Sequence, residues 1–97
     1  MNDTLQELLS ELETQPTDTT IIGLSPKVVV HNDEIHTFEE VALQIAKATG
    51  CSFDRGMKFA DEIDRKGRAI VFSGEIDKCL VVSSILEEIA LHTQIET

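Results

Sequence analysis

Residues 27–41 read KVVVHNDEIHTFEEV and contain, in order, the features of a strand, a polar turn and the start of a helix. The β-branched run Val28-Val29-Val30 predicts a strand that is buried on both faces. Thr37 and Glu40 have the spacing of a capping box, in which each side chain binds the other residue's backbone N–H. We therefore expect a helix to begin directly after Thr37.

The sequence after this unit predicts two further helices and two further strands. Ser52 and Gly67 bracket a second helix, residues 69–72 form a strand, and a third helix begins at Glu75. Residues 92–97 can add a short edge strand. The order β-α-α-β-α-(β) indicates an α+β fold with three helices packed on a small antiparallel sheet. The expected inward faces are Phe38, Val41, Ala42, Ile45 and Thr49; Phe53, Met57, Ala60 and Ile63; and Ile76, Cys79, Leu80, Ser83, Leu86 and Ala90, widened by Val82, Ile85 and Ile89.

Residues 1–26 differ from the rest of the chain in charge. They contain five acids and no Lys or Arg, whereas the remaining residues hold 13 acids and all 8 bases. Residues 4–15 predict a short amphipathic helix, and residues 16–26 have the composition of a linker. We expect an acidic N-terminal extension, residues 1–26, followed by one domain, residues 27–97. The predicted helix packs its apolar face on its own domain, frays in solution, or docks on another protein. That face consists of Leu5, Leu8, Leu9 and Leu12.

The overall composition excludes several classes of function. A formal net charge of −10 on 97 residues leaves no basic surface for nucleic acid or for an anionic membrane. The sequence has no apolar run long enough to span a bilayer and no secretory signal. Two cysteines are too few for a disulfide framework, so we expect a cytoplasmic protein.

Catalytic and metal-binding patterns are weak. Cys51 has no neighbouring base in the sequence, and Cys79 lies on an apolar helix face. We therefore do not expect an enzyme. A hydrolase that depends on Cys51 is a distant alternative. The group His31, Asp33, Glu34 and His36 contains metal-ligand residue types, but its spacing matches no closed zinc pattern. The five glycines are scattered and form no phosphate loop. We therefore expect neither a metal nor a cofactor.

The polar turn at residues 32–34 is the remaining candidate for a binding site. It places a carboxamide and carboxylates beside a helix that carries Phe38, Val41 and Ile45. Such a surface suits a ligand with a cationic head and a hydrophobic body. The alternative is that Asn32 and Asp33 only supply hydrogen bonds to the turn and the helix cap.

Two stretches resemble the ClpS family, the adaptors of Clp AAA+ proteases. Residues 29–41 are similar to the opening strand and turn of that family. Residues 66–76, KGRAIVFSGEI, are similar to its second strand and the entry to its third helix. The resemblance runs from about Lys27 to the end of the chain.

The resemblance implies an adaptor that binds proteins by a destabilising N-terminal residue, an N-degron, and delivers them to a Clp AAA+ unfoldase. It implies that Asn32 and Asp33 accept hydrogen bonds from the α-ammonium of the substrate, and that residues 1–26 are the extension that engages the ATPase. Asp64 stands where the family usually has a His that helps to hold the same ammonium. The pocket for a large hydrophobic first residue (Leu, Phe, Tyr or Trp) is implied at Phe38, Val41, Ile45, Ala60 and Ile63.

Other positions depart from the family pattern or mark its second interface. Phe38 replaces the usual Met at the mouth of the pocket, and His36-Thr37 replaces the common Thr-Pro. Glu75 matches an acidic residue near the ATPase contact, whereas Leu80 occupies a position where the family has a basic residue. The alternative hypothesis is a diverged ClpS-like domain without degron activity, which binds another protein through its leucine-striped N-terminal helix.

Overall fold

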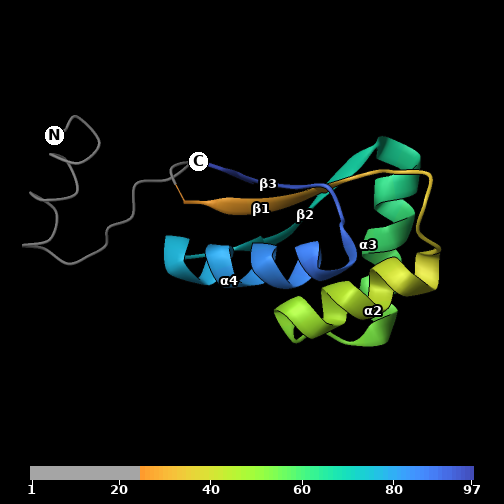
Figure 1. Cartoon of the computed structure of the whole chain (residues 1–97), viewed down its shortest axis with the longest axis horizontal. Helices are drawn as coiled ribbons and strands as arrows, with labels where there is room; N and C mark the ends of the chain where they lie inside the picture. The colour runs from red at the N-terminus through yellow and green to blue at the C-terminus, as the bar shows by residue number, and fades with distance from the viewer. Residues whose placement is uncertain (1–24) are drawn as a thin grey trace, which may run out of the picture.

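The predicted valine strand is the centre of the sheet. A computed structural model describes residues 25–97; the predicted N-terminal helix lies outside them. In it, β1 (Lys27–His31) pairs antiparallel with β2 (Arg68–Ser73) on one side and β3 (Thr93–Glu96) on the other (Figure 1). The predicted C-terminal edge strand is therefore present. The α+β class and the three helices on a small antiparallel sheet are confirmed.

The helices begin and end where the capping residues predict. Thr37 and Glu40 form the expected capping box at the start of α2 (Phe38–Thr49), and the hydroxyl of Ser52 accepts a hydrogen bond at the start of α3 (Phe53–Lys66). Both helices end at a glycine with positive φ, which glycine adopts without strain: 81° at Gly50 and 89° at Gly67. Within residues 25–97 no helix is long and apolar enough to cross a membrane.

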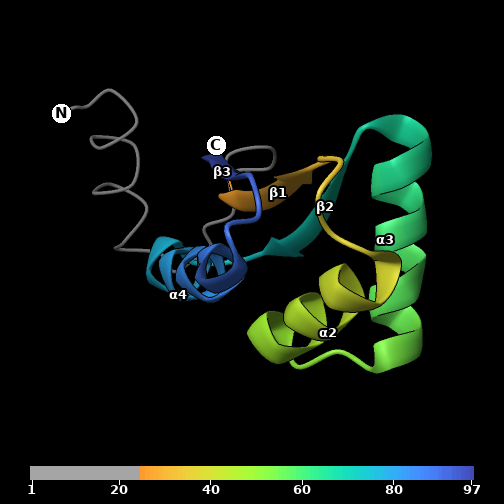
Figure 2. The same ribbon diagram turned by 45° about the vertical axis from the view of Figure 1, so that its right-hand side comes forward.

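The sheet is covered differently on its two faces. α4 (Ile76–Leu86) runs along one face, while α2 and α3 pack together at one end of the molecule (Figure 2). Val28 and Val30 belong to the core beneath these helices, whereas Val29 lies on the opposite face because side chains alternate along a strand. Arg68 on β2 and Glu96 on β3 form an ion pair, with 3.0 Å between the guanidinium nitrogen and the carboxylate oxygen. Because β2 and β3 flank β1, this ion pair crosses over the central strand. All three valines are fully buried, as the sequence predicts.

The buried face of α4 differs from the expected one. Cys79, Ser83 and Leu86 are buried as predicted, but Ile76 and Leu80 are 50% and 56% exposed. The face that meets the sheet consists of residues 79, 82, 83 and 86, which have the i, i+3, i+4, i+7 spacing of a single stripe. Residues 76 and 80 form a second stripe about a quarter of a turn away. The helix also ends at Leu86 and continues only as the 3₁₀ turn η1 (Glu87–Ile89), which places Ala90 beyond it.

Candidate functional site

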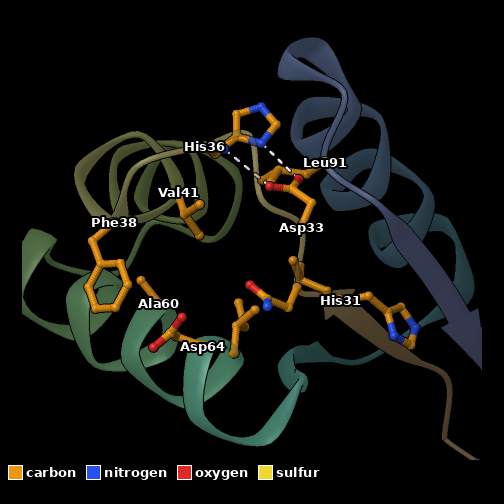
Figure 3. Close-up of a pocket in the computed structure, with 11 residues that line it drawn as sticks. His31, Asp33, His36, Phe38, Val41, Ala60, Asp64 and Leu91 are labelled. Carbon is orange, nitrogen blue, oxygen red and sulfur yellow. Dashed lines mark hydrogen bonds and ion pairs between the residues drawn. The ribbon is translucent and has the colours of Figure 1, made fainter.

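A pocket of about 50 Å³ opens where the turn after β1 meets α2 and α3 (Figure 3). The structure brings together in it seven of the residues that the sequence analysis implied for a binding site: Asn32, Asp33, Phe38, Val41, Ala60, Ile63 and Asp64. It adds four that the analysis did not place in a site: Val30, His31, His36 and Leu91.

The apolar wall of the pocket comes from the facing sides of α2 and α3. Phe38 and Val41 lie one turn apart on α2, and Ala60 and Ile63 lie one turn apart on α3. Figure 3 shows Phe38, Val41 and Ala60 on the same side of the pocket. Phe38 is 38% exposed to solvent, so it lies at the opening of the pocket, whereas Ala60 and Ile63 are buried.

Two residues of the implied site do not line this pocket. Ile45 is fully buried in the hydrophobic core, one turn of α2 beyond Val41, so it supports the wall from behind. Glu75 is the N-cap residue of α4 and is exposed, outside the pocket.

The polar side of the pocket is organised by Asp33 and His36. One carboxylate oxygen of Asp33, Oδ1, accepts hydrogen bonds from the backbone N–H groups of Ile35 (2.9 Å) and His36 (3.1 Å). The other, Oδ2, lies 2.8 Å from Nδ1 of His36. Nε2 of His36 lies 2.6 Å from the carbonyl oxygen of Ile89. Both partners of the imidazole are acceptors, so both hydrogen bonds form together only when the ring is protonated.

The electrostatics of this pair agree with that geometry. The hydrogen bond to Asp33 raises the pKa of His36; burial opposes this, while the Ile89 carbonyl and the charges of Asp33 and Glu40 add to it. For Asp33, burial raises the pKa, but the hydrogen bonds from Ile35 and from the backbone and ring of His36 together lower it. Both pKa shifts favour the charged forms, as the hydrogen bonds do, so the two side chains hold the shape of the turn as an ion pair.

Asn32 and Asp64 take no part in the pair of Asp33 and His36. The backbone N–H of Asn32 donates to the carbonyl oxygen of Gly67 at 2.9 Å, which ties the turn to the end of α3. Asp64 lies on the last turn of α3, and Figure 3 shows it beside the apolar wall, with Asp33 on the other side of the pocket. Within residues 25–97, no side-chain hydrogen bond or ion pair engages the Asp64 carboxylate, which leaves its oxygens available to a ligand.

Of the pocket residues that the sequence did not predict, some have a recognisable sequence feature and others have none. His36 is one of the metal-ligand residue types in the turn, and its i, i+3 spacing from Asp33 is the sequence feature that indicates their contact. Leu91 carried no signal, because it reaches the pocket only through the folding of the C-terminal segment onto β1. Within the described residues no group of acidic, His or Cys side chains has the arrangement of a metal site.

The sequence of the domain matches the model of a known family. The family model of the ATP-dependent Clp protease adaptor protein ClpS matches residues 25–95. The chain belongs to the ClpS family. The resemblance read from the two sequence stretches is therefore confirmed, and the family is one of adaptors.

A solved structure and curated relatives agree with this assignment. ClpS2 of Agrobacterium tumefaciens, bound to L-phenylalaninamide, superposes with a TM-score of 0.66 at 21% identity, covering 74% of this chain and 96% of that one. The chain is also similar to E3 ubiquitin-protein ligase UBR2 of Homo sapiens (34% identity over 58 residues) and of Mus musculus (37% over 51). These matches cover 60% and 53% of this chain but 3% of each ligase, so they concern one small region of a much larger protein.

Proposed function

We propose that this ClpS-family chain binds the N-terminal residue of other proteins in the pocket between the β1–α2 turn, α2 and α3. The observation that carries the proposal is the composition of this pocket, in which an apolar wall and three oxygen-bearing side chains line the same cavity. A free N-terminal residue has the complementary composition, because its α-ammonium is cationic and its side chain can be apolar. The ligand of the Agrobacterium ClpS2 structure, L-phenylalaninamide, has the same two parts.

The three polar side chains have separate tasks in this proposal. Asp64 and the carboxamide oxygen of Asn32 accept hydrogen bonds from the α-ammonium. Asp33 already accepts from two backbone N–H groups and from His36, so it contributes its remaining lone pairs and its charge. An ammonium group has three protons to donate, and the pocket offers it three side chains that carry acceptor oxygens.

The apolar part of the ligand lies against Phe38, Val41, Ala60 and Ile63. Burial of a Leu or Phe side chain contributes about 1.5–3 kcal/mol. Each hydrogen bond to the charged ammonium adds about 1.5–3 kcal/mol. At the upper ends of these ranges, three such bonds and the apolar contact offset the smallest cost of association, about 4 kcal/mol, and leave a binding free energy of roughly −8 kcal/mol, which corresponds to a micromolar dissociation constant. The net charge of −10 favours the approach of a cationic N-terminus.

The test is a titration with fluorescent peptides that begin with Leu, Phe, Tyr or Trp, each with a free and an acetylated N-terminus. Acetylation removes the charge and leaves the side chain unchanged. We expect binding of the free peptides and loss of binding on acetylation. Equal binding of both forms, or of neither, would show that the pocket is not an N-degron site.

We propose further that the chain delivers what it binds to a Clp AAA+ unfoldase, with Glu75 at the contact. Glu75 is exposed at the start of α4, so a partner there leaves the pocket open to a substrate. Both cysteines are free thiols, which supports a reducing cytoplasmic setting. The test is degradation of a reporter with an N-terminal Leu by a Clp protease. We expect Glu75→Lys to slow degradation while peptide affinity is unchanged.

A further inference from the structure

α4 has an exposed apolar face that the core and the pocket do not use. Ile76, Leu80 and Val81 are 50%, 56% and 58% exposed, and we call these three residues the α4 outer face. Positions 76 and 80 are one turn apart, so Ile76 and Leu80 lie side by side, and Val81 extends the exposed apolar surface about 100° further round the helix. Singly exposed apolar residues are ordinary, but a cluster on a helix indicates a contact surface.

The segment that precedes the domain enters beside this face. The carbonyl oxygen of Pro26 accepts a hydrogen bond from the backbone N–H of Gly74 at 3.1 Å, and Gly74 lies two residues before Ile76. Figure 1 shows the start of β1 and the start of α4 at the same end of the molecule, with α2 at the other end.

We propose that the leucine face of the N-terminal extension, Leu5, Leu8, Leu9 and Leu12, docks on the α4 outer face of the same chain. A helix of about a dozen residues is marginal alone in water, so this predicted helix requires an apolar partner. The leucine face spans two turns, or about 10 Å along a helix, and the α4 outer face spans about 8 Å. Glu7 and Glu11 fall on the opposite side of the predicted helix, so docking keeps their charge away from Asp77.

The connecting segment is long enough for this contact. Between Leu12 and Pro26 the chain has 14 peptide units, and a flexible segment of that length has an end-to-end distance of about 20 Å. α4, with 11 residues, is about 16 Å long, so every part of it is within reach. A short tether of this kind holds the two faces at an effective concentration of about a millimolar, which makes even a weak contact populated.

Other exposed apolar side chains are less suitable partners. Ile35 and Leu43 are exposed, but Ile35 lies just before α2 and Leu43 lies within it, and Figure 1 shows α2 at the end of the molecule away from the start of β1. Docking on α4 also places the extension directly beside Glu75. The extension would then shield the surface that we propose for the ATPase, whereas the N-degron pocket stays open.

The experiment is methyl NMR on the full chain, with resonances of Ile76, Leu80 and Val81 as reporters and those of Ile35 and Leu43 as references. The test variant is Leu8→Asp/Leu12→Asp. The matched control is Gln6→Asp/Ser10→Asp, which adds the same charge on the other side of the predicted helix. We expect the test variant to shift the three reporter resonances, and the control and the references to stay at their wild-type positions.

Three results would overturn the proposal. Reporter resonances that are the same in the wild type and in the test variant would mean that the leucine face does not touch α4. Shifts at Ile70 on β2 in place of the reporters would put the contact on the sheet. Wild-type resonances that move with protein concentration would indicate docking between two copies of the chain. The Leu80→Asp variant gives the reciprocal test, in which we expect faster amide exchange within residues 5–12.

Discussion

The imidazole of His36 lies 2.8 Å from the carboxylate of Asp33 and, through its other nitrogen, 2.6 Å from the carbonyl oxygen of Ile89. It therefore links the turn between β1 and α2 to Ile89 in the 3₁₀ turn η1, 53 residues later in the sequence. The side chains of His36 and Asp33 are only 10% and 21% exposed, so solvent screens the pair weakly. The shape of the turn thus depends on the charge of both groups.

His36→Ala is expected to lower the free energy of unfolding by about 1–3 kcal/mol near pH 6, because it leaves the partly buried Asp33 carboxylate with one partner fewer. The pKa of His36 is raised in the folded state, so its contribution is complete below its ordinary value of 6.5 and is lost as the pH rises through the raised value. The pKa of Asp33 is lowered, so its contribution is present above its ordinary value of 3.8 and is lost as the pH falls through the lowered value.

The difference in stability between the wild type and His36→Ala should therefore be largest between about pH 4 and 6.5 and decrease on both sides. Urea denaturation at a series of pH values measures it. The exposed His92 provides the control: His92→Ala leaves the Asp33 pair intact and should not reproduce this profile. A pH-independent difference for His36→Ala would show that the ion pair does not form.

Asp64→Asn is expected to weaken binding of a free Leu peptide by roughly ten- to a hundredfold, because it replaces a charge-assisted hydrogen bond to the ammonium by a neutral one. Fluorescence anisotropy measures the change. Asp61→Asn is the matched control, because it removes the same charge from the same helix outside the pocket and breaks only an exposed ion pair with Arg65. Equal losses in the two variants would mean that Asp64 acts only through long-range charge.

Phe38→Ala is expected to change which first residue is preferred more than it changes affinity overall. Phe38 stands half-exposed at the mouth of a pocket of about 50 Å³, so its ring limits the size of the side chain that can enter. We expect the ratio of Trp-peptide to Leu-peptide affinity to rise in the variant, as measured by competition between the two. A ratio that stays at the wild-type value would show that the pocket is limited elsewhere.

Local signals predicted most of the fold. The capping box of Thr37 and Glu40, and the glycines that end α2 and α3, act within a few residues of the backbone they stabilise, so their spacing is visible in the sequence. The boundaries of α2 and α3 followed from them, whereas the end of α4, which has no such signal, did not. The same locality explains why the Asn32-Asp33 turn could be singled out.

Contacts between distant segments were harder to predict. The bond from His36 to Ile89 depends on how η1 meets the turn, and no pattern of a single strand or helix encodes it. Ile45 has the same periodicity as the pocket residues of α2, yet the third turn of the helix faces the core. On α4, two apolar stripes compete, and only the packing against the sheet determines which one is buried.

Gly56→Ala is expected to destabilise the domain by about 1–3 kcal/mol, although the same change at most helix positions is stabilising. A Cβ atom at Gly56 would lie 2.5 Å from the carbonyl oxygen of Ala42 and 3.1 Å from two further backbone atoms of that residue. Backbone cannot rotate away, so α2 and α3 must separate. Because the facing sides of these two helices form the apolar wall of the pocket, peptide affinity should fall together with stability.

Urea denaturation and peptide titration of the same samples test both effects of Gly56→Ala. Lys58→Ala is the control, because it places an alanine on the exposed side of the same helix and should change stability by no more than about 0.5 kcal/mol. If Gly56→Ala instead raised the free energy of unfolding by the ordinary helix-propensity gain, the close contact between α2 and α3 would be refuted. If it lowered stability and left peptide affinity unchanged, the pocket would not depend on the spacing of the two helices.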